Sequence, residues 1–433
     1  MAAKIAERVE LRIESIGARG DGLARLGGKP VFVPFTLPGE RVVASLVGER
    51  GDGLVAQVLQ RLEVSHERVG PPCPHFGVCG GCALQHWSDE SYANWKVELL
   101  RTALSRQGLS APIEPLRRTP PHARRRAGFV LRFGARSAKL GFRERSSHRI
   151  IAVERCPVLQ PSLERLATAV PATLSGLAPA NSEWMLDAGA TETGIDLLIT
   201  APGVPSLAAR EAVAGLAEQL DLARVSWRSG ENAEPEPMLI RRMPILRFAG
   251  VAVEPPPGAF FQASLEGEAA LTAEVLQMTA GARRVADLYA GIGTFSVPLA
   301  RSEVDVLSVE GAADALGALA RAARKSGLSI RALQRDLARD PLQATELDDS
   351  DAVVFDPPRA GAKSQSTALA TSKVPVVVAV SCNPATFARD ARLITQSGYR
   401  LERIVPVDQF LWSPHLELVE EAMGGEMQAE MPL

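Results

Sequence analysis

The sequence predicts a multidomain protein with a small β-barrel, a central α+β domain and an α/β domain built on a mainly parallel sheet. Three observations predict this order. Short alternating strands with glycine-rich turns come first, a cysteine cluster follows, and apolar strands then alternate with helices. We place the domains at residues 1–62, 63–249 and 250–433. A chain of 433 residues is longer than one hydrophobic core usually supports.

The first domain is predicted from five short apolar segments between residues 5 and 62. Valine, leucine and phenylalanine alternate with polar residues, and glycine-rich turns separate the segments. This pattern favours a small OB-like barrel, a fold that often binds nucleic acid. A barrel with no such role would give the same pattern.

The central domain combines a helix with several strands. The stretch YANWKVELLRTAL predicts the helix, and alternation between residues 124 and 155 predicts strands. The stretch SGENAEPEPM is rich in acid and proline, so we expect a loop or linker there.

The third domain alternates strand, loop and helix from about residue 250. RRVADLYAGIG, VDVLSVE, DAVVFDPP and VPVVVAVSC each contain a continuous apolar run that is typical of a buried strand. Such strands between helices predict a Rossmann-like sheet covered on both faces, with ligands at the carboxyl ends of its strands.

Charge is divided unevenly along the chain, although its net value is only −2. Residues 1–160 contain 25 Lys and Arg against 15 Asp and Glu, so the remainder carries net −12. A basic front half suggests a polyanionic partner, although solvated charge could be distributed this way by chance.

No run of 18 apolar residues occurs, and the first 30 residues do not resemble a signal peptide. We therefore expect a cytoplasmic protein.

Two strand ends predict a nucleoside site. In DLYAGIGTF, Asp287 ends a strand while Gly291 and Gly293 open a helix, which lets a ligand approach the backbone. Ser296 replaces the third glycine of the dinucleotide motif. Glu310 closes the next strand, 23 residues after Asp287, where a carboxylate can bind ribose hydroxyls. The alternative is that Glu310 only caps a helix.

Two later strand ends add reactive groups at the same edge. In FDPPRAG, two prolines stiffen the chain where Asp356 leaves the sheet. An ordinary turn would look similar. Cys382 ends the following strand, in VSCNPATF. A lone cysteine is usually structural, but here its position beside three strand-end carboxylates favours a nucleophile.

Two further groups lie near the C-terminus, in SPHLELVEE. His415 and Glu417 occupy alternate positions of a strand-like segment, so both would face one side. Either group could act as an acid or base, and a solvated edge carboxylate is the alternative.

Four of the five cysteines predict a metal site. Cys73, Cys79 and Cys82 are spaced C-x5-C-x2-C, and Cys156 follows in ERCPVL. Four thiolates can bind zinc or a [4Fe–4S] cluster.

Residues 117–149 contain eleven Lys or Arg and one acid, Glu144. On strands, that density favours phosphate binding over a merely solvated face.

Taken together, these motifs resemble the RNA (uracil-5)-methyltransferase family, especially the branch acting on bacterial 23S ribosomal RNA. GDGLAR through VFVPFTLPGERV resembles its TRAM barrel, and the four cysteines match its [4Fe–4S] motif. FFQAS, DLYAGIGTF, FDPPRAGA and SCNPATFARD match its class I methyltransferase domain in order. The resemblance covers nearly the whole chain.

The resemblance implies roles for particular residues. Cys382 would be the nucleophile that adds to C6 of uracil, and Glu417 the base that removes the C5 proton. The residues implied to bind or shape the pocket for S-adenosylmethionine are Gln262, Tyr289, Gly291, Thr294, Glu310, Asp336 and Asp356. Two departures concern binding: Ser264 replaces the usual Asn, and His122 stands where an aromatic residue is common.

Three other functions compete with this prediction. Transfer-RNA uracil-5 methylation uses the same nucleophile, although those bacterial enzymes usually lack both the barrel and the cluster. In DNA cytosine-5 methylation a proline precedes the nucleophile, whereas Ser381 does here. A non-catalytic ribosome-assembly factor would have no need of Cys382, Asp356 and Glu417 together. We expect the protein to be a monomer. Its expected partner is RNA, most of all ribosomal RNA.

Overall fold

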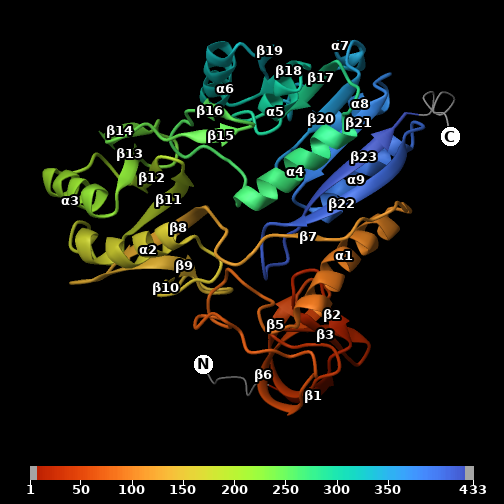
Figure 1. Cartoon of the computed structure of the whole chain (residues 1–433). Helices are drawn as coiled ribbons and strands as arrows, with labels where there is room; N and C mark the ends of the chain where they lie inside the picture. The colour runs from red at the N-terminus through yellow and green to blue at the C-terminus, as the bar shows by residue number, and fades with distance from the viewer. Residues whose placement is uncertain (1–6, 425–433) are drawn as a thin grey trace. The chain divides into compact units, whose positions relative to one another are not determined.

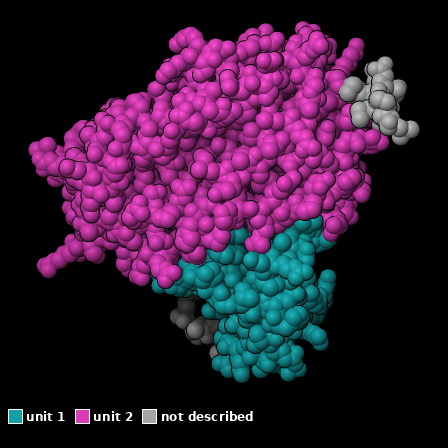
Figure 2. All heavy atoms as spheres, in the orientation of Figure 1, with its two compact units in different colours: residues 1–99, 142–151, 410–414 teal, residues 100–141, 152–409, 415–433 magenta. Residues whose placement is uncertain are grey.

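The computed structural model describes residues 7–424, so the outer ends of the first and third predicted domains lie outside the described residues. The described chain divides into two compact units (Figure 2). Unit 1 contains residues 7–99, 142–151 and 410–414, and unit 2 contains residues 100–141, 152–409 and 415–424. The boundaries at 62/63 and 249/250 stay a prediction. No helix among the described residues is long and apolar enough to cross a membrane.

Unit 1 contains a six-stranded sheet with the order β1-β5-β6-β4-β3-β2. Its alternating pattern buries one side of each strand in a core that includes Leu11, Val31 and Val42. We predicted five strand segments here, and the structure contains six strands. One of them, β2, is only two residues long. The strands are β1 (Arg8–Arg12), β2 (Ser15–Ile16), β3 (Gly22–Leu26), β4 (Lys29–Val33), β5 (Arg41–Arg50) and β6 (Gly53–Glu63).

A seven-stranded sheet follows, with the order β10-β9-β8-β11-β12-β13-β14 (Figure 1). Helices α2 and α3 pack on one face of it, where Trp184, Leu186 and Ala188 are buried. The elements of this region are α1 (Asp89–Arg106), β8 (Arg126–Phe133), β9 (Ala138–Arg143), β10 (Ile150–Ala152), α2 (Pro161–Leu174), β11 (Glu183–Thr191), β12 (Gly194–Ala201), α3 (Leu207–Gln219), β13 (Leu222–Ser229) and β14 (Glu236–Ile240).

One expectation in this region was wrong in part. The stretch SGENAEPEPM is a turn only in its first half, because β14 begins at Glu236 and pairs with β13. Pro237 is tolerated there because β14 is the last strand of the sheet, where one side of the backbone needs no partner. The predicted helix around YANWKVELLRTAL is confirmed as α1. A hairpin, β15 (Leu246–Phe248) and β16 (Val251–Val253), comes next.

The C-terminal region has an eight-stranded sheet with the order β19-β18-β17-β20-β21-β23-β22-β7. The first five strands are parallel, as predicted, and β23 runs antiparallel to β21. The strands are β7 (Arg117–Arg118), β17 (Arg284–Leu288), β18 (Asp305–Glu310), β19 (Ile330–Gln334), β20 (Ala352–Phe355), β21 (Val376–Ser381), β22 (Arg400–Asp408) and β23 (Glu417–Met423).

Helices cover both faces of this sheet, which explains why its strands are apolar throughout. Helices α4 and α5 pack on one core cluster and α8 and α9 on the other. The helices are α4 (Leu265–Met278), α5 (Ser296–Arg301), α6 (Ala313–Ser326), α7 (Ala344–Leu347), α8 (Lys363–Ala370) and α9 (Pro384–Thr395).

Candidate active site

The parallel strands bring the predicted site residues to one edge of the sheet. Leu288 pairs with Phe355, and Phe355 pairs with Ala379, so β17, β20 and β21 end near one another. Glu310 is the last residue of β18, Asp356 follows β20, and Cys382 follows β21. This edge is the place where open α/β sheets bind ligands.

The glycine-rich turn after β17 folds around the Glu310 carboxylate. The Gly291 N–H donates to Glu310 Oε2 at 2.9 Å, and the Ala312 N–H donates to Oε1 at 2.8 Å. Gly291 and Gly293 have φ values of 56° and 99°, which L residues rarely adopt. A Cβ at Gly293 would lie 2.5 Å from Leu319 Cδ1. Glycine is therefore needed here both for conformation and for packing.

Asp287 lies under this turn and is fully buried. Ser296 Oγ donates to Asp287 Oδ2 at 2.5 Å, and Ser308 Oγ donates to Ser296 at 2.7 Å. Burial raises the pKa of Asp287 to about 7, and the nearby Asp356 carboxylate adds to the rise. The serine found in place of a third glycine thus supports the strand-end carboxylate.

Asp356 belongs to a buried amide network. Gln262 Nε2 donates to Asp356 Oδ2 at 3.4 Å, and Gln409 Nε2 donates to Gln262 Oε1 at 2.6 Å. Gln409 Oε1 in turn accepts the Ala263 N–H at 3.0 Å. Burial raises the pKa of Asp356 well above its usual range, and the bond from Gln262 partly opposes that rise.

Cys382 sits between β21 and α9 and is half-buried. Asn383 caps α9, because its side chain accepts the Ala385 N–H at 3.1 Å, and Pro384 occupies the first helical turn. Burial raises the pKa of Cys382 to about 11, Glu417 and Asp356 add to the rise, and Arg359 opposes it. The thiol is therefore protonated at neutral pH, whereas a nucleophile has to react as the thiolate.

Glu417 starts β23 and is 4% exposed. Ser381 pairs with Leu418, so Cys382 and Glu417 are the next residues along the two antiparallel chains. Their electrostatic interaction agrees with this register. The expectation that His415 shares a strand with Glu417 was wrong, because β23 begins only at Glu417.

Tyr289 and Asp336 lie within electrostatic range of each other. Burial raises the pKa of Tyr289 to about 12, with Asp390, Asp336 and Glu310 contributing to the rise. Asp336 is exposed, and its carboxylate accepts the Ala338 N–H at 3.1 Å. Thr294 precedes α5 and is half-buried.

Three polar residues of this region were missed or given no role by the sequence analysis. Gln409 holds Gln262, Asp390 accepts the Ala362 N–H at 2.8 Å, and Arg359 is the positive group beside Cys382. No local sequence pattern marks the roles of these three residues. Ser264, which replaces the usual Asn, acts as the N-cap of α4, because its hydroxyl accepts the Gly267 N–H at 3.0 Å. Asn and Ser are both favoured N-cap residues.

The predicted metal ligands are partly exposed. Cys73, Cys79 and Cys82 belong to unit 1, and Cys156 belongs to unit 2. Burial raises the pKa of Cys79, and Cys73 adds to the rise, so these two thiols lie within electrostatic range. Across residues 7–424, no group of three or more His, Cys, Asp or Glu side chains is arranged to hold a metal ion.

Known proteins resemble this chain along nearly its whole length. Family models for tRNA (Uracil-5-)-methyltransferase and for the TRAM domain match residues 258–419 and 3–47. An uncharacterized RNA methyltransferase of Caulobacter vibrioides is 45% identical over 95% of this chain and 98% of its own. The 23S rRNA (uracil(1939)-C(5))-methyltransferase RlmD of Chromohalobacter salexigens is 36% identical over 94% of this chain and 87% of its own.

A solved structure shows the same fold. The tRNA (uracil-54, C5)-methyltransferase of Pyrococcus abyssi, in complex with S-adenosyl-L-homocysteine, superposes with a TM-score of 0.74 at 23% identity. The match covers 96% of this chain and 99% of that one. The predicted TRAM domain and methyltransferase fold are thereby confirmed. Because relatives at 36% and 45% identity match nearly the whole chain, the chain belongs to the RNA (uracil-5)-methyltransferase family.

Proposed function

We propose that this protein methylates C5 of a specific uridine in RNA, most of all in 23S ribosomal RNA, through a covalent bond between Cys382 and C6 of the base. One observation carries the proposal. Cys382, Asp356 and Glu417 interact electrostatically at the carboxyl edge of the parallel strands. A thiol between two carboxylates suits a reaction that needs both a nucleophile and a base.

S-adenosylmethionine is the proposed methyl donor, held by Gln262, Tyr289, Gly291, Thr294, Glu310, Asp336 and Asp356. The cradle formed by the Gly291 turn and Glu310 supports this role, because nothing lies within 4 Å of the place that a Cβ at Gly291 would take, which leaves the backbone open to a ligand. When bound, S-adenosylmethionine supplies an electrophilic methyl group on a positively charged sulfur. Asp356 and Glu310 supply the negative charge that favours such a cation.

The proposed chemistry begins with the thiol. The thiol loses its proton to solvent water, which Arg359 and the N-terminus of α9 favour, and the thiolate adds to C6 of uracil. The electron pair moves to C5, which takes the methyl group. Glu417 then removes the proton left on C5, the C6–S bond breaks, and the thiolate leaves.

Measurements on Cys382→Ala and on the wild type test this route. The variant should bind S-adenosylmethionine with unchanged affinity and transfer no methyl group to uridine. A 5-fluorouridine RNA should form a stable adduct with the wild type, since fluorine at C5 cannot leave as a proton. Methyl transfer by the variant, or the absence of any adduct in an active wild-type preparation, would contradict the covalent route.

The class of RNA needs a separate experiment. The name of the RlmD relative supports ribosomal RNA, whereas the description of the matching family model favours transfer RNA as the second candidate. Mapping 5-methyluridine in both RNAs from a deletion strain separates them. Loss from ribosomal RNA alone supports the proposal, and loss from transfer RNA alone contradicts it.

We further propose that Cys73, Cys79, Cys82 and Cys156 hold a [4Fe–4S] cluster. The support is their spacing and the electrostatic interaction between Cys73 and Cys79, which suits thiolates that share a metal. Protein purified without oxygen should be brown and contain iron and sulfide. A colourless protein that contains zinc would contradict the cluster.

We propose that the protein is located in the cytoplasm, with its RNA, and that it is a monomer. Size-exclusion chromatography with light scattering measures the oligomeric state.

A further inference from the structure

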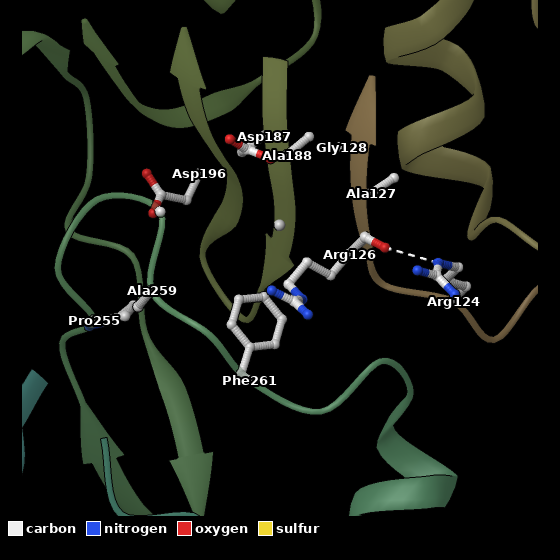
Figure 3. A pocket seen from close by; sticks show the side chains of 12 residues that line it. Arg124, Arg126, Ala127, Gly128, Asp187, Ala188, Asp196, Pro255, Ala259 and Phe261 are labelled. Carbon is white, nitrogen blue, oxygen red and sulfur yellow. Dashed lines mark hydrogen bonds between the residues drawn. The ribbon is translucent and has the colours of Figure 1, made fainter. Parts of the chain in front are cut away.

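A small cavity lies on the face of the seven-stranded sheet opposite to α2 and α3. Its volume is about 160 Å³, below the roughly 300–1,000 Å³ of sites for drug-sized ligands. Strands β8, β11 and β12 form its floor, and residues 255–261 close one side (Figure 3). Glycines keep it open, because a Cβ at Gly128 would lie 3.0 Å from Asp187 Oδ1.

The cavity contains a carboxylate and a guanidinium whose bonding capacity is unused. Asp187 accepts no hydrogen bond from a described residue, in contrast to Asp196, which Arg224 binds at 2.8 and 2.6 Å. The Arg126 guanidinium stacks 4.2 Å from the centre of the Phe260 ring. In Figure 3, Arg126 and Phe261 point toward each other, and Asp187 and Asp196 lie on the neighbouring strands.

Burial shifts the pKa values of both groups toward the neutral form, and their opposite charges act against that shift. Burial lowers the pKa of Arg126 to about 10, which still leaves it charged. Burial raises the pKa of Asp187, and the positive charges of Arg228 and Arg126 oppose that rise. The cavity therefore places the Asp187 carboxyl group within electrostatic range of the Arg126 guanidinium.

The chain connects this cavity directly to the proposed methyl-transfer site. Phe261, which lines the cavity, precedes Gln262, which donates to Asp356. Arg125 fixes this connection, because its Nε donates to the Gln262 carbonyl at 3.1 Å and its N–H to the Ala263 carbonyl at 2.8 Å. Consecutive Cα atoms are about 3.8 Å apart, so a residue that lines the cavity directly neighbours one that contacts Asp356.

We propose that the cavity binds a guanine that flanks the target uridine, with the Asp187 carboxylate accepting its N1–H and N2–H. Guanine is the base that offers two parallel donors to a carboxylate, whereas uracil offers a single N–H between two carbonyls. Arg126 lies where it can neutralise a phosphate of the same nucleotide. This inference rests on the proposed function and adds a determinant of its substrate.

The test compares methylation of RNA hairpins in which each nucleotide beside the target uridine is replaced in turn. For the wild type, one position should require guanosine, and inosine there, which lacks the N2 amino group, should lower kcat/KM about ten-fold through KM. Asp187→Asn should lose about the same factor on the guanosine substrate and no longer distinguish inosine. Glu183→Gln is the matched control, since it removes one negative charge from the same face of β11. That control should keep the guanosine preference.

The outcomes are separable. Absence of methylation by the wild type would contradict the proposed function itself. Methylation with no guanosine position, or an Asp187→Asn variant that keeps the inosine discrimination, would overturn the inference and leave the function standing. Thermal unfolding of Asp187→Asn should match the wild type, because the carboxyl group accepts no hydrogen bond from a described residue. Should that variant unfold, Arg126→Gln tests the same cavity through a weaker affinity for every RNA in the set.

Discussion

At the scale of single residues, Cys382 is the group whose environment conflicts most with its proposed role. Burial, Glu417 and Asp356 hold its pKa at about 11, so only a minute fraction is thiolate at neutral pH. A protonated thiol protects the resting protein from oxidation and alkylation. The reaction therefore needs a change of charge near Cys382 when its ligands bind.

Two substitutions near Cys382 should move its pKa in opposite directions. Glu417→Gln removes a negative charge that raises this pKa, so the pKa should fall, while Arg359→Gln should raise it. Each unit of decrease makes the thiolate about ten-fold more abundant at neutral pH. The rate at which iodoacetamide alkylates Cys382, followed by peptide mass spectrometry across pH, measures both shifts.

The same variants separate reactivity from catalysis. Glu417→Gln should react faster with iodoacetamide and yet methylate RNA more slowly, because the proposed base is lost. A change of alkylation rate in the same direction for both variants would show that charge at these two positions does not control the thiol.

The strand-end residues were predictable because an apolar run shows where a buried strand stops. Asp287, Glu310, Asp356 and Cys382 each end such a run, and the structure brings all four to one edge. Gln409 and Asp390 were not predictable in this way. Their roles depend on which backbone N–H groups lie nearby in space, and those come from the distant residues Ala263 and Ala362.

At the scale of elements, the turn between β17 and α5 depends on two glycines for different reasons. Gly291 needs its positive φ, and nothing lies within 4 Å of the place its Cβ would take. Gly293 also has a positive φ, and a Cβ there would lie 2.5 Å from Leu319 Cδ1 and 3.0 Å from Val297 Cγ2. Gly291→Ala should lower the free energy of unfolding by about 1 kcal/mol, and Gly293→Ala by about 3 kcal/mol. Urea denaturation measures both, and equal losses would mean that packing against α6 contributes nothing.

Strand β23 contains a carboxyl group that weakens the fold. Glu420 is fully buried between Ala379 and Ile404, and its Oε1 has no hydrogen-bond partner among residues 7–424. Burial raises its pKa well above the usual value, with Glu421 adding to the rise. The folded state therefore keeps the proton that the unfolded state releases above a pH of about 4.3, and stability falls as the pH rises from there.

Glu420→Gln removes this dependence, because glutamine cannot ionise in the unfolded state. The variant should be more stable than the wild type at neutral pH, and the gain should increase as the pH rises above about 4.3. Glu402→Gln on β22 is the control. Glu402 forms a surface ion pair with Arg400, and such a pair contributes less than about 1 kcal/mol to the free energy of unfolding. A gain for Glu420→Gln that stays constant with pH would contradict the buried proton.

At the scale of the whole chain, periodicity identified the sheets but not the compact units. Residues 410–414 belong to unit 1, because the Trp412 carbonyl accepts the Ala83 and Leu84 N–H groups at 2.9 and 3.1 Å. Residues so far apart in sequence share no local pattern. Local patterns report only which side of an element is buried, so the sequence could not show that this segment joins the unit of the barrel.

The uneven charge of the chain leads to a prediction about RNA affinity. Arg136 and Lys139 are exposed near the hairpin between β8 and β9, within the basic stretch 117–149. Each cation that neutralises a phosphate makes the logarithm of the binding constant fall with the logarithm of salt, by about 0.7 for single strands. Replacing both with Gln should therefore make that slope shallower by about 1.4.

A matched substitution in the acidic part of the chain distinguishes this local effect from net charge. Arg331→Gln removes an exposed arginine on β19 and should leave the slope unchanged, because it lies outside the basic stretch 117–149. Fluorescence anisotropy with a labelled RNA, repeated across salt concentrations, gives all three slopes. If Arg331→Gln reduced the slope as much per charge as the change at residues 136 and 139, RNA would be attracted by overall charge and not gripped by the basic strands.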